Sequence, residues 1–204
     1  MTTTNARAQP HPPHVVDVGR LPRHPLQDGG GGTKEIWTVS TPGLDLVWQL
    51  KLLELRGPAA TLRAPAHTHQ LVIGMSGPQV HAGPTKRQLP LRRDQAMFVR
   101  SPTALFSRAR MRMPGASRVL VLSFADEGLA PSLVFDTLDG ESVVPPGTQA
   151  LVLMEGLLDL DGIAVPPESA VILDAAASHT VTGDKARIVI VSLDSADEVG
   201  APTV

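Results

Sequence analysis

The apolar residues of this chain come in short runs that are separated by turn-forming residues. After the first 14 residues most runs are only four to nine residues long, and they end at Gly, Pro, Asp or Ser. With 18 glycines and 19 prolines among 204 residues, this pattern is typical of β-strands joined by turns and leaves little room for long helices. The clearest strands are predicted at residues 46–55, 71–75, 96–99, 107–113, 119–124, 150–154, 170–173 and 187–193.

One part of the chain is repeated. Residues 116–124 (ASRVLVLSF) match residues 185–193 (KARIVIVSL) position by position, at an offset of 69 residues. Upstream of each copy an acidic turn leads into an apolar strand, at residues 94–99 and 168–173, and before that turn an apolar strand ends at a glycine. Three matched segments in the same order indicate a duplicated β-unit.

A duplicated β-unit of this kind is typical of a bicupin, in which two cupin-type barrels or jelly rolls are fused. We therefore predict an all-β protein with a flexible leader at residues 1–14, an N-terminal cupin half at 15–125 and a C-terminal half at 126–204. The leader has no apolar stretch of signal-peptide length, and no run of about 18 apolar residues occurs anywhere. These observations predict a cytoplasmic protein that makes no membrane contact.

The charges are divided unevenly along the chain. Residues 1–118 hold 16 Lys and Arg against 6 Asp and Glu, whereas residues 119–204 hold 2 against 14. Two explanations are open: the basic and the acidic half dock against each other, or each half has a surface with a different use. The formal net charge is only −2, so a basic protein that coats nucleic acid is not expected. Cysteine is absent, so a disulfide scaffold, a zinc ribbon and a thiol nucleophile are not expected either.

His67 and His69 form the candidate metal site. Because residues two apart in a strand share a face, both imidazoles could point into a barrel, as in the H-x-H that opens a cupin metal site. The first half lacks the carboxylate and the distant histidine that complete such a site, and in the second half only His179 stands at an expected position. Two imidazoles rarely hold a divalent ion tightly, so we expect polar pocket histidines, no metal and no other cofactor. If a metal is bound, His67 and His69 are its predicted ligands.

The strand predicted at residues 46–55 carries Gln49 and Lys51 on one face. If this face lines the barrel, these two residues would form, with His67 and His69, a recess that suits a small carboxylate. If the face meets solvent instead, Lys51 only keeps the strand soluble. The alternation of residues leaves both arrangements open.

A basic face is predicted on the strand at residues 107–113, where Arg108, Arg110 and Arg112 alternate with small or apolar residues. Between residues 86 and 118 the chain holds nine cations against one acid, Asp94. Aromatic residues make up only 3% of the chain, tyrosine is absent and no recognition motif is visible. We therefore expect a docking surface or a solvated edge here, and no nucleic-acid partner.

Several motifs of the first half resemble the HutD/Ves family of bicupins. The chain reads DGGGGTKEI at residues 28–36, WQLKLLE at 48–54, then a Gly-Pro turn, then a strand that ends in glycine at position 77. Members of that family show an Asn-Gly-Gly-Gly-x-Thr-Arg-Glu-Ile run, a Trp-Arg-x-Ser strand, a Gly-Pro turn and a strand ending in glycine. The resemblance covers roughly residues 20–130. The residues at matching motif positions, to which we assign a structural role, are Gly29, Gly30, Gly31, Thr33, Glu35 and Trp48.

This resemblance implies a metal-free bicupin associated with histidine utilisation, which binds a small acidic metabolite such as formylglutamate and acts as a regulator. The family's Arg and Ser are replaced by Gln49 and Lys51, and its Pro-Gly-x-Asp-Arg segment by residues 65–70 (PAHTHQ), which predicts an altered ligand. We expect a non-catalytic binding protein, with no catalytic residues and a regulatory role in amino-acid catabolism or stress; a homodimer is one form that it could take. The alternative is a metal-dependent oxygenase or isomerase that uses His67 and His69.

Overall fold

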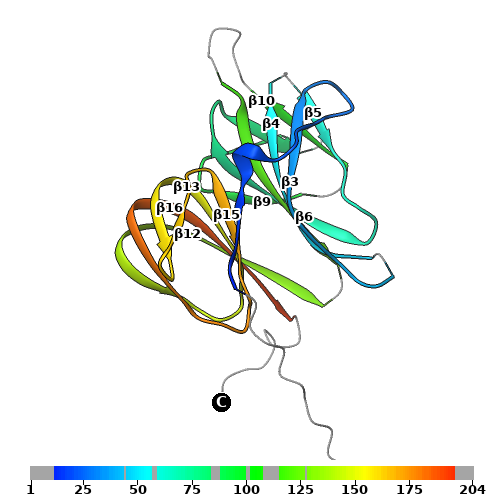
Figure 1. Ribbon diagram of the computed structural model, residues 1–204. Coiled ribbons are helices and arrows are strands. Elements are labelled where there is room, and N and C mark those ends of the chain that lie inside the picture. Colours follow the sequence, from blue (N-terminus) through cyan, green and yellow to red (C-terminus); the bar gives the residue numbers. More distant parts are fainter. Residues whose placement is uncertain are drawn as a thin grey trace, which may run out of the picture. The chain divides into compact units, whose positions relative to one another are not determined.

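The computed structural model consists almost entirely of β-strands, which confirms the predicted all-β class (Figure 1). It describes residues 12–43, 45–56, 59–83, 88–99, 102–107, 115–126 and 128–195. Within these ranges one short 3₁₀ helix, Val18–Arg20, interrupts the strands, and no helix is long and apolar enough to cross a membrane. The chain divides into two compact units, an N-terminal unit within residues 18–130 and a C-terminal unit built from residues 131–194 and the strand His14–Asp17.

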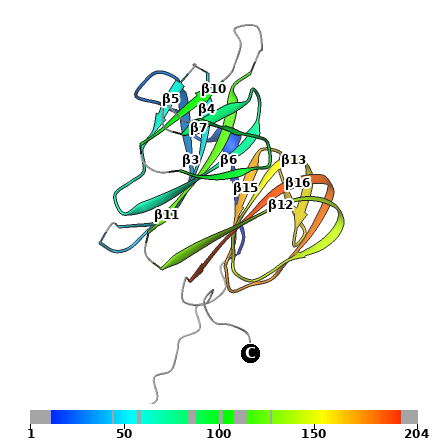
Figure 2. The same ribbon diagram turned by 180° about the vertical axis from the view of Figure 1, so that it is seen from behind.

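The N-terminal unit contains two antiparallel sheets (Figures 1 and 2). The six-stranded sheet runs in the order β2 (His24–Pro25), β3 (Gly31–Ser40), β4 (Leu46–Leu55), β11 (Ser117–Ala125), β6 (Thr68–Ser76) and β9 (Ala96–Val99). The four-stranded sheet runs β5 (Ala59–Leu62), β10 (Thr103–Ser107), β7 (Val80–Gly83) and β8 (Leu89–Leu91). Buried side chains from both sheets form one core, in which Leu53, Val72, Val119 and Val121 meet Leu105.

The C-terminal unit holds the third sheet, in which β14 (Ile163–Val165) pairs with β13 off the main path. The main order is β1 (His14–Asp17), β15 (Ser169–Ile172), β13 (Thr148–Leu160), β16 (His179–Ser195) and β12 (Leu129–Val144). The N-terminal strand β1 thus completes the C-terminal sheet by pairing antiparallel with β15, with Val16 opposite Ala170. Figure 1 shows this blue strand beside the orange β15.

The predicted duplication is confirmed by strand order and register. The order β9-β6-β11-β4 in the N-terminal unit recurs as β15-β13-β16-β12 in the C-terminal unit. Val121 pairs with Val72, and Ile190, which lies 69 residues after Val121, pairs with Leu151 in the same relation. The two copies of the sequence repeat therefore occupy the same central strand of two equivalent sheets.

The turns of the two copies also match. Asp94 and Glu168 both have positive φ angles, of 57° and 58°, at the acidic turns that precede β9 and β15. Gly77 and Gly156 have φ angles of 87° and 85°, and a Cβ at either position would collide with a backbone oxygen of the facing strand. Backbone geometry, and not only apolar composition, is therefore shared by the two units.

Candidate functional site

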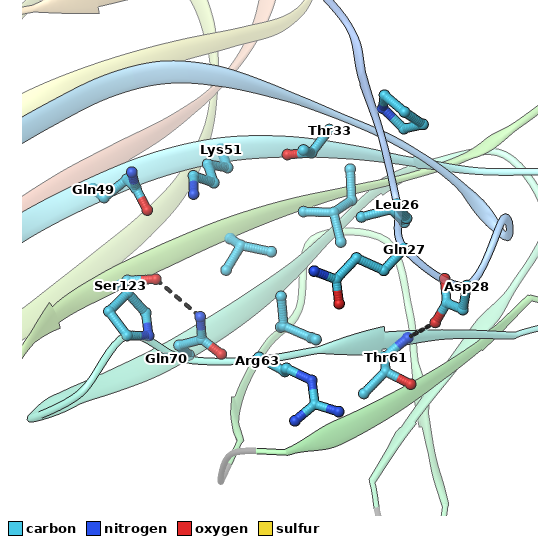
Figure 3. Close-up of a pocket in the computed structure, with 15 residues that line it drawn as sticks. Leu26, Gln27, Asp28, Thr33, Gln49, Lys51, Thr61, Arg63, Gln70 and Ser123 are labelled. Atoms are coloured by element: carbon cyan, nitrogen blue, oxygen red, sulfur yellow. Dashed lines mark hydrogen bonds between the residues drawn. The ribbon is translucent and has the colours of Figure 1, made fainter.

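The N-terminal unit contains a pocket of about 410 Å³ between β3, β4, β6 and β11 on one side and the segments around β2 and β5 on the other (Figure 3). Gln49 and Lys51 of β4 and Thr33 of β3 line it, together with apolar side chains such as Leu53 and Val121. The face of β4 that carries Gln49 and Lys51 is therefore the inner face of this unit. The volume lies at the lower end of the range found for small-molecule sites.

A row of polar side chains crosses four neighbouring strands beside the pocket. In the sheet register Thr38 of β3 is opposite Gln49, Gln49 is opposite Ser123 of β11, and Ser123 is opposite Gln70 of β6. Gln49 Nε2 donates to Thr38 Oγ1 at 2.9 Å. Gln70 Nε2 donates to Ser123 Oγ at 3.0 Å, which Figure 3 shows as a dashed line. Both amides are buried, with 7% and 2% exposure. The hydrogen bonds fix the orientation of these buried amides.

Lys51 supplies a positive charge to the pocket. Its Nζ lies 3.8 Å from Oε2 of Glu35, and the same oxygen accepts a hydrogen bond of 2.9 Å from Gln49 Nε2. The Lys51 side chain is 32% exposed, so the ion pair is partly screened by solvent. An ammonium has three donors, so this pairing leaves donors for a further acceptor. Arg63 adds a second cation to the wall, across the pocket from Lys51 in Figure 3.

Two buried polar atoms of the pocket residues lack hydrogen-bond partners. They are Oε1 of Gln70 and Oγ1 of Thr33. A buried polar atom without a partner carries a desolvation cost of about 1–3 kcal/mol. A bound molecule or water with polar groups at these positions would remove that cost.

His67 and His69 are not brought to this pocket, which corrects the expected arrangement. His67 lies in a turn with a φ of 56°, before β6 begins at Thr68, so the alternation of a strand does not relate it to His69. His69 points to the face of β6 opposite to Gln70 and packs against Phe98 and Phe124, at ring-centroid distances of 5.1 and 5.8 Å. Both histidines are exposed.

The arrangement of the histidines does not suit a cupin metal site. Among the residues that the structure describes, no group of three or more His, Asp or Glu side chains is placed to hold a metal ion. His179, at the expected distant position of the second half, lies with Nδ1 2.6 Å from Oδ2 of Asp161. This hydrogen bond, and a second one from the Thr180 backbone, lower the pKa of Asp161. The pair joins the β13–β14 turn to the start of β16.

Two of the six motif residues, Thr33 and Glu35, lie at the same pocket. Thr33 lines it, and Glu35 binds both Gln49 and Lys51. Gly30 and Gly31 are buried where β3 begins, whereas Gly29 is exposed in the preceding turn. Trp48, at 5% exposure, belongs to the opposite and also buried face of β4.

Gln70, Ser123 and Arg63 are among the pocket residues that sequence reasoning missed. A signal existed for two of them, because Ser123 interrupts an apolar strand and Gln70 is the polar residue that precedes the run Leu-Val-Ile. Arg63 lies outside any regular strand and had no such signal. The face predicted from Arg108, Arg110 and Arg112 lies outside the described residues.

No protein-family model and no curated protein matches the chain. Among solved structures, PA5104 of Pseudomonas aeruginosa PAO1, a conserved protein of unknown function, is 20% identical with a TM-score of 0.73 over 91% of this chain and 100% of that one. HutD from Pseudomonas fluorescens SBW25, in a formate condition, is 20% identical with a TM-score of 0.71 over 90% and 99%. The fold is that of a HutD-like cupin.

The HutD-like cupin fold is also similar to that of enzymes. Quercetin 2,3-dioxygenase from Acinetobacter baumannii is 10% identical, with a TM-score of 0.55 over 85% of this chain and 83% of that one. The fold alone is therefore compatible with both binding proteins and enzymes, and the function depends on the residues of the pocket.

Proposed function

We propose that this protein binds a small carboxylic acid in the N-terminal pocket and does not convert it. The observation that carries the proposal is the position of Lys51, whose ammonium lies at a pocket of about 410 Å³ next to the buried amides of Gln49 and Gln70. A cation at a partly desolvated position attracts an anion more strongly than one in bulk water.

The walls of the pocket fit the remainder of such a ligand. Leu53, Leu62 and Val121 offer an apolar surface for a short carbon chain. The free Oε1 of Gln70 accepts a hydrogen bond, so an acid that also carries an N–H or O–H group matches the pocket better than a plain fatty acid. N-formyl-L-glutamate has both features and is the first probe that we would use.

The absence of a visible reaction centre supports binding without catalysis. Ser123 is hydrogen-bonded to Gln70 and not to a histidine, so it has no general base. Among the described residues that line the pocket there is no histidine, and its only carboxylate, Asp28, accepts a hydrogen bond from the Thr61 backbone amide. We infer that the bound acid acts as a signal, with a regulatory role in amino-acid catabolism, histidine breakdown included.

The proposal is tested by melting the protein with N-formyl-L-glutamate, L-glutamate, urocanate and gluconate. An acid present at about 100 times its dissociation constant should add about 2.7 kcal/mol to the free energy of unfolding. For a chain of this length we expect the melting temperature to rise by roughly 5–10 °C.

A melting temperature that none of these acids changes would count against the proposal. So would about one tightly bound transition-metal ion per purified chain in elemental analysis, because that result favours the metal-dependent enzyme built on His67 and His69. A shift with one acid and no stoichiometric metal is the expected pair of results.

A further inference from the structure

The strand β9, at one end of the six-stranded sheet of the N-terminal unit, has an open edge. One edge of β9 pairs with β6, and no described strand pairs with the other edge. The equivalent strand of the C-terminal unit is β15, and there the same edge is covered by β1, a segment of this chain. Of two equivalent sheet edges, one is thus closed by an added strand and the other is open.

Hydrogen bonds at the start of β9 show which backbone groups point to the open edge. The Gly74 N–H donates to the carbonyl oxygen of Gln95 at 3.0 Å, so the carbonyl of Gln95 faces β6. Successive residues of a strand turn their N–H and C=O groups to opposite edges. Met97 therefore also faces β6, whereas the backbone groups of Ala96 and Phe98 point to the open edge.

The side chains of β9 do nothing to block this edge. The strand reads Ala-Met-Phe-Val and contains neither a charge nor a proline. Ala96 is exposed, and Phe98 is 51% exposed although its ring packs on His69 at a centroid distance of 5.1 Å. An open apolar edge is a template for pairing with another chain, so native proteins usually shorten such edges, cover them or place proline or charge on them.

The other edge strands that the structure describes are protected in these ways. β2 and β8 each contain a proline, and β12 contains three carboxylates. In β5 the backbone N–H of Thr61 donates to the carboxylate of Asp28. β14 is only three residues long, and β1 ends with Asp17. Among these edge strands β9 therefore stands out as the unprotected one.

We propose that β9 pairs antiparallel with β9 of a second copy of this chain, so that their six-stranded sheets join across a twofold axis. Antiparallel strands of identical sequence satisfy this symmetry, because every contact then occurs twice. When Ala96 lies opposite Phe98 of the partner subunit, the outward backbone groups of both residues form hydrogen bonds between the copies. Met97 then lies at the axis, opposite Met97 of the partner subunit.

The sequence of β9 suits pairing with itself. In this register the small side chain of Ala96 lies beside the large ring of Phe98 of the partner subunit on one face of the sheet, which covers part of the exposed ring. Because β9 carries no charge, two copies place no like charges opposite each other. β9 contributes no residue to the N-terminal pocket, so the pairing does not depend on acid binding.

Sedimentation velocity of the full chain, over protein concentrations from about 1 µM to about 1 mM, tests the pairing. A few backbone hydrogen bonds and one exposed ring from each copy form a small interface, so we expect a weak dimer whose fraction rises with concentration. Phe98→Lys, which places a charge on the edge, should raise the dissociation constant of the dimer by about tenfold or more. Ala96→Pro should do the same, because it removes an outward N–H and leaves the pairing with β6 intact.

The matched control is Leu157→Lys, which replaces another exposed apolar side chain, 59% exposed, by the same cation outside β9. It should change the dissociation constant by less than about twofold. Circular dichroism of the variants should be that of the wild type, because Ala96, Phe98 and Leu157 are all exposed.

A single cysteine reads the register, because the chain has none of its own. In an antiparallel pair the Cα atoms of residues that are not hydrogen-bonded to each other lie about 4.5 Å apart, which a disulfide can span. Mild oxidation of Met97→Cys with copper phenanthroline should therefore give a covalent dimer, whereas Leu157→Cys should remain largely uncoupled.

Three results would overturn the proposal. The first is a chain that sediments as a monomer at every concentration. The second is a dimer whose dissociation constant is changed by neither Phe98→Lys nor Ala96→Pro, because the copies would then meet at another surface. The third is cross-linking of Met97→Cys that is no greater than that of Leu157→Cys.

Discussion

Replacing Lys51 by alanine should weaken binding of N-formyl-L-glutamate by about ten- to a hundredfold. A hydrogen bond to a charged group contributes roughly 1.5–3 kcal/mol, and 1.4 kcal/mol corresponds to a factor of ten in affinity. Lys51 lines the pocket next to the buried Gln49, where water screens its charge less than at the surface. Isothermal titration calorimetry of wild type and variant measures the difference.

A matched control is the substitution of Lys185 by alanine, which removes the same charge from the C-terminal unit. It should leave the affinity within about twofold of the wild type. An unchanged affinity in Lys51→Ala, or an equal loss in both variants, would show that the acid does not bind at Lys51.

The substitution of Gly30 by alanine should destabilise the N-terminal unit by about 3 kcal/mol or more. An added Cβ would lie far inside van der Waals contact with the backbone oxygen of Ala59, at the start of β5. Backbone cannot rotate away as a flexible side chain can, so β3 and β5 would have to separate. We expect the melting temperature to fall by roughly 6–12 °C.

Its neighbour Gly29 is the control, because both residues belong to the same glycine run. Gly29 has a φ of 72° but nothing within 4 Å of an added Cβ, so alanine there costs only the backbone strain of about 1–2 kcal/mol. If Gly29→Ala lowered the melting temperature more than Gly30→Ala, close approach of the two strands would not explain the buried glycine.

The strands and the duplication could be predicted from the sequence because both depend on local patterns, namely short apolar runs, turn residues and a repeated segment. The strand predicted at residues 46–55 is β4, with the same ends. The matched segment at 185–193 lies in β16, and the one at 116–124 lies in β11 from Ser117 onward. Both copies have the same pattern of apolar residues after the same kind of turn, so they form the same structure. Which face of β4 is inward could not be predicted, because both faces are buried: Gln49 is 7% exposed and Trp48 5%.

The candidate site was predicted only in part, for two physical reasons. Side chains alternate between the two faces of a sheet only inside a strand, and His67 lies in a turn before β6 begins. The prediction that His67 and His69 share a face was therefore wrong. Gln70, and not His69, lies on the pocket side of β6. Pairing between distant strands is not encoded locally either. Nothing in the four residues of β1 indicates that they pair with β15, more than 150 positions later.

The central claim, that the N-terminal pocket binds a small acid at Lys51, is tested most directly by NMR. The backbone amide spectrum of the labelled protein would be followed during titration with N-formyl-L-glutamate. We expect the largest shifts at residues 49–53 of β4, at Gln70 of β6 and at residues 121–123 of β11, which line the pocket or lie between its lining residues. Shifts centred on His67 and His69, shifts confined to the C-terminal unit, or no saturable shift would contradict it.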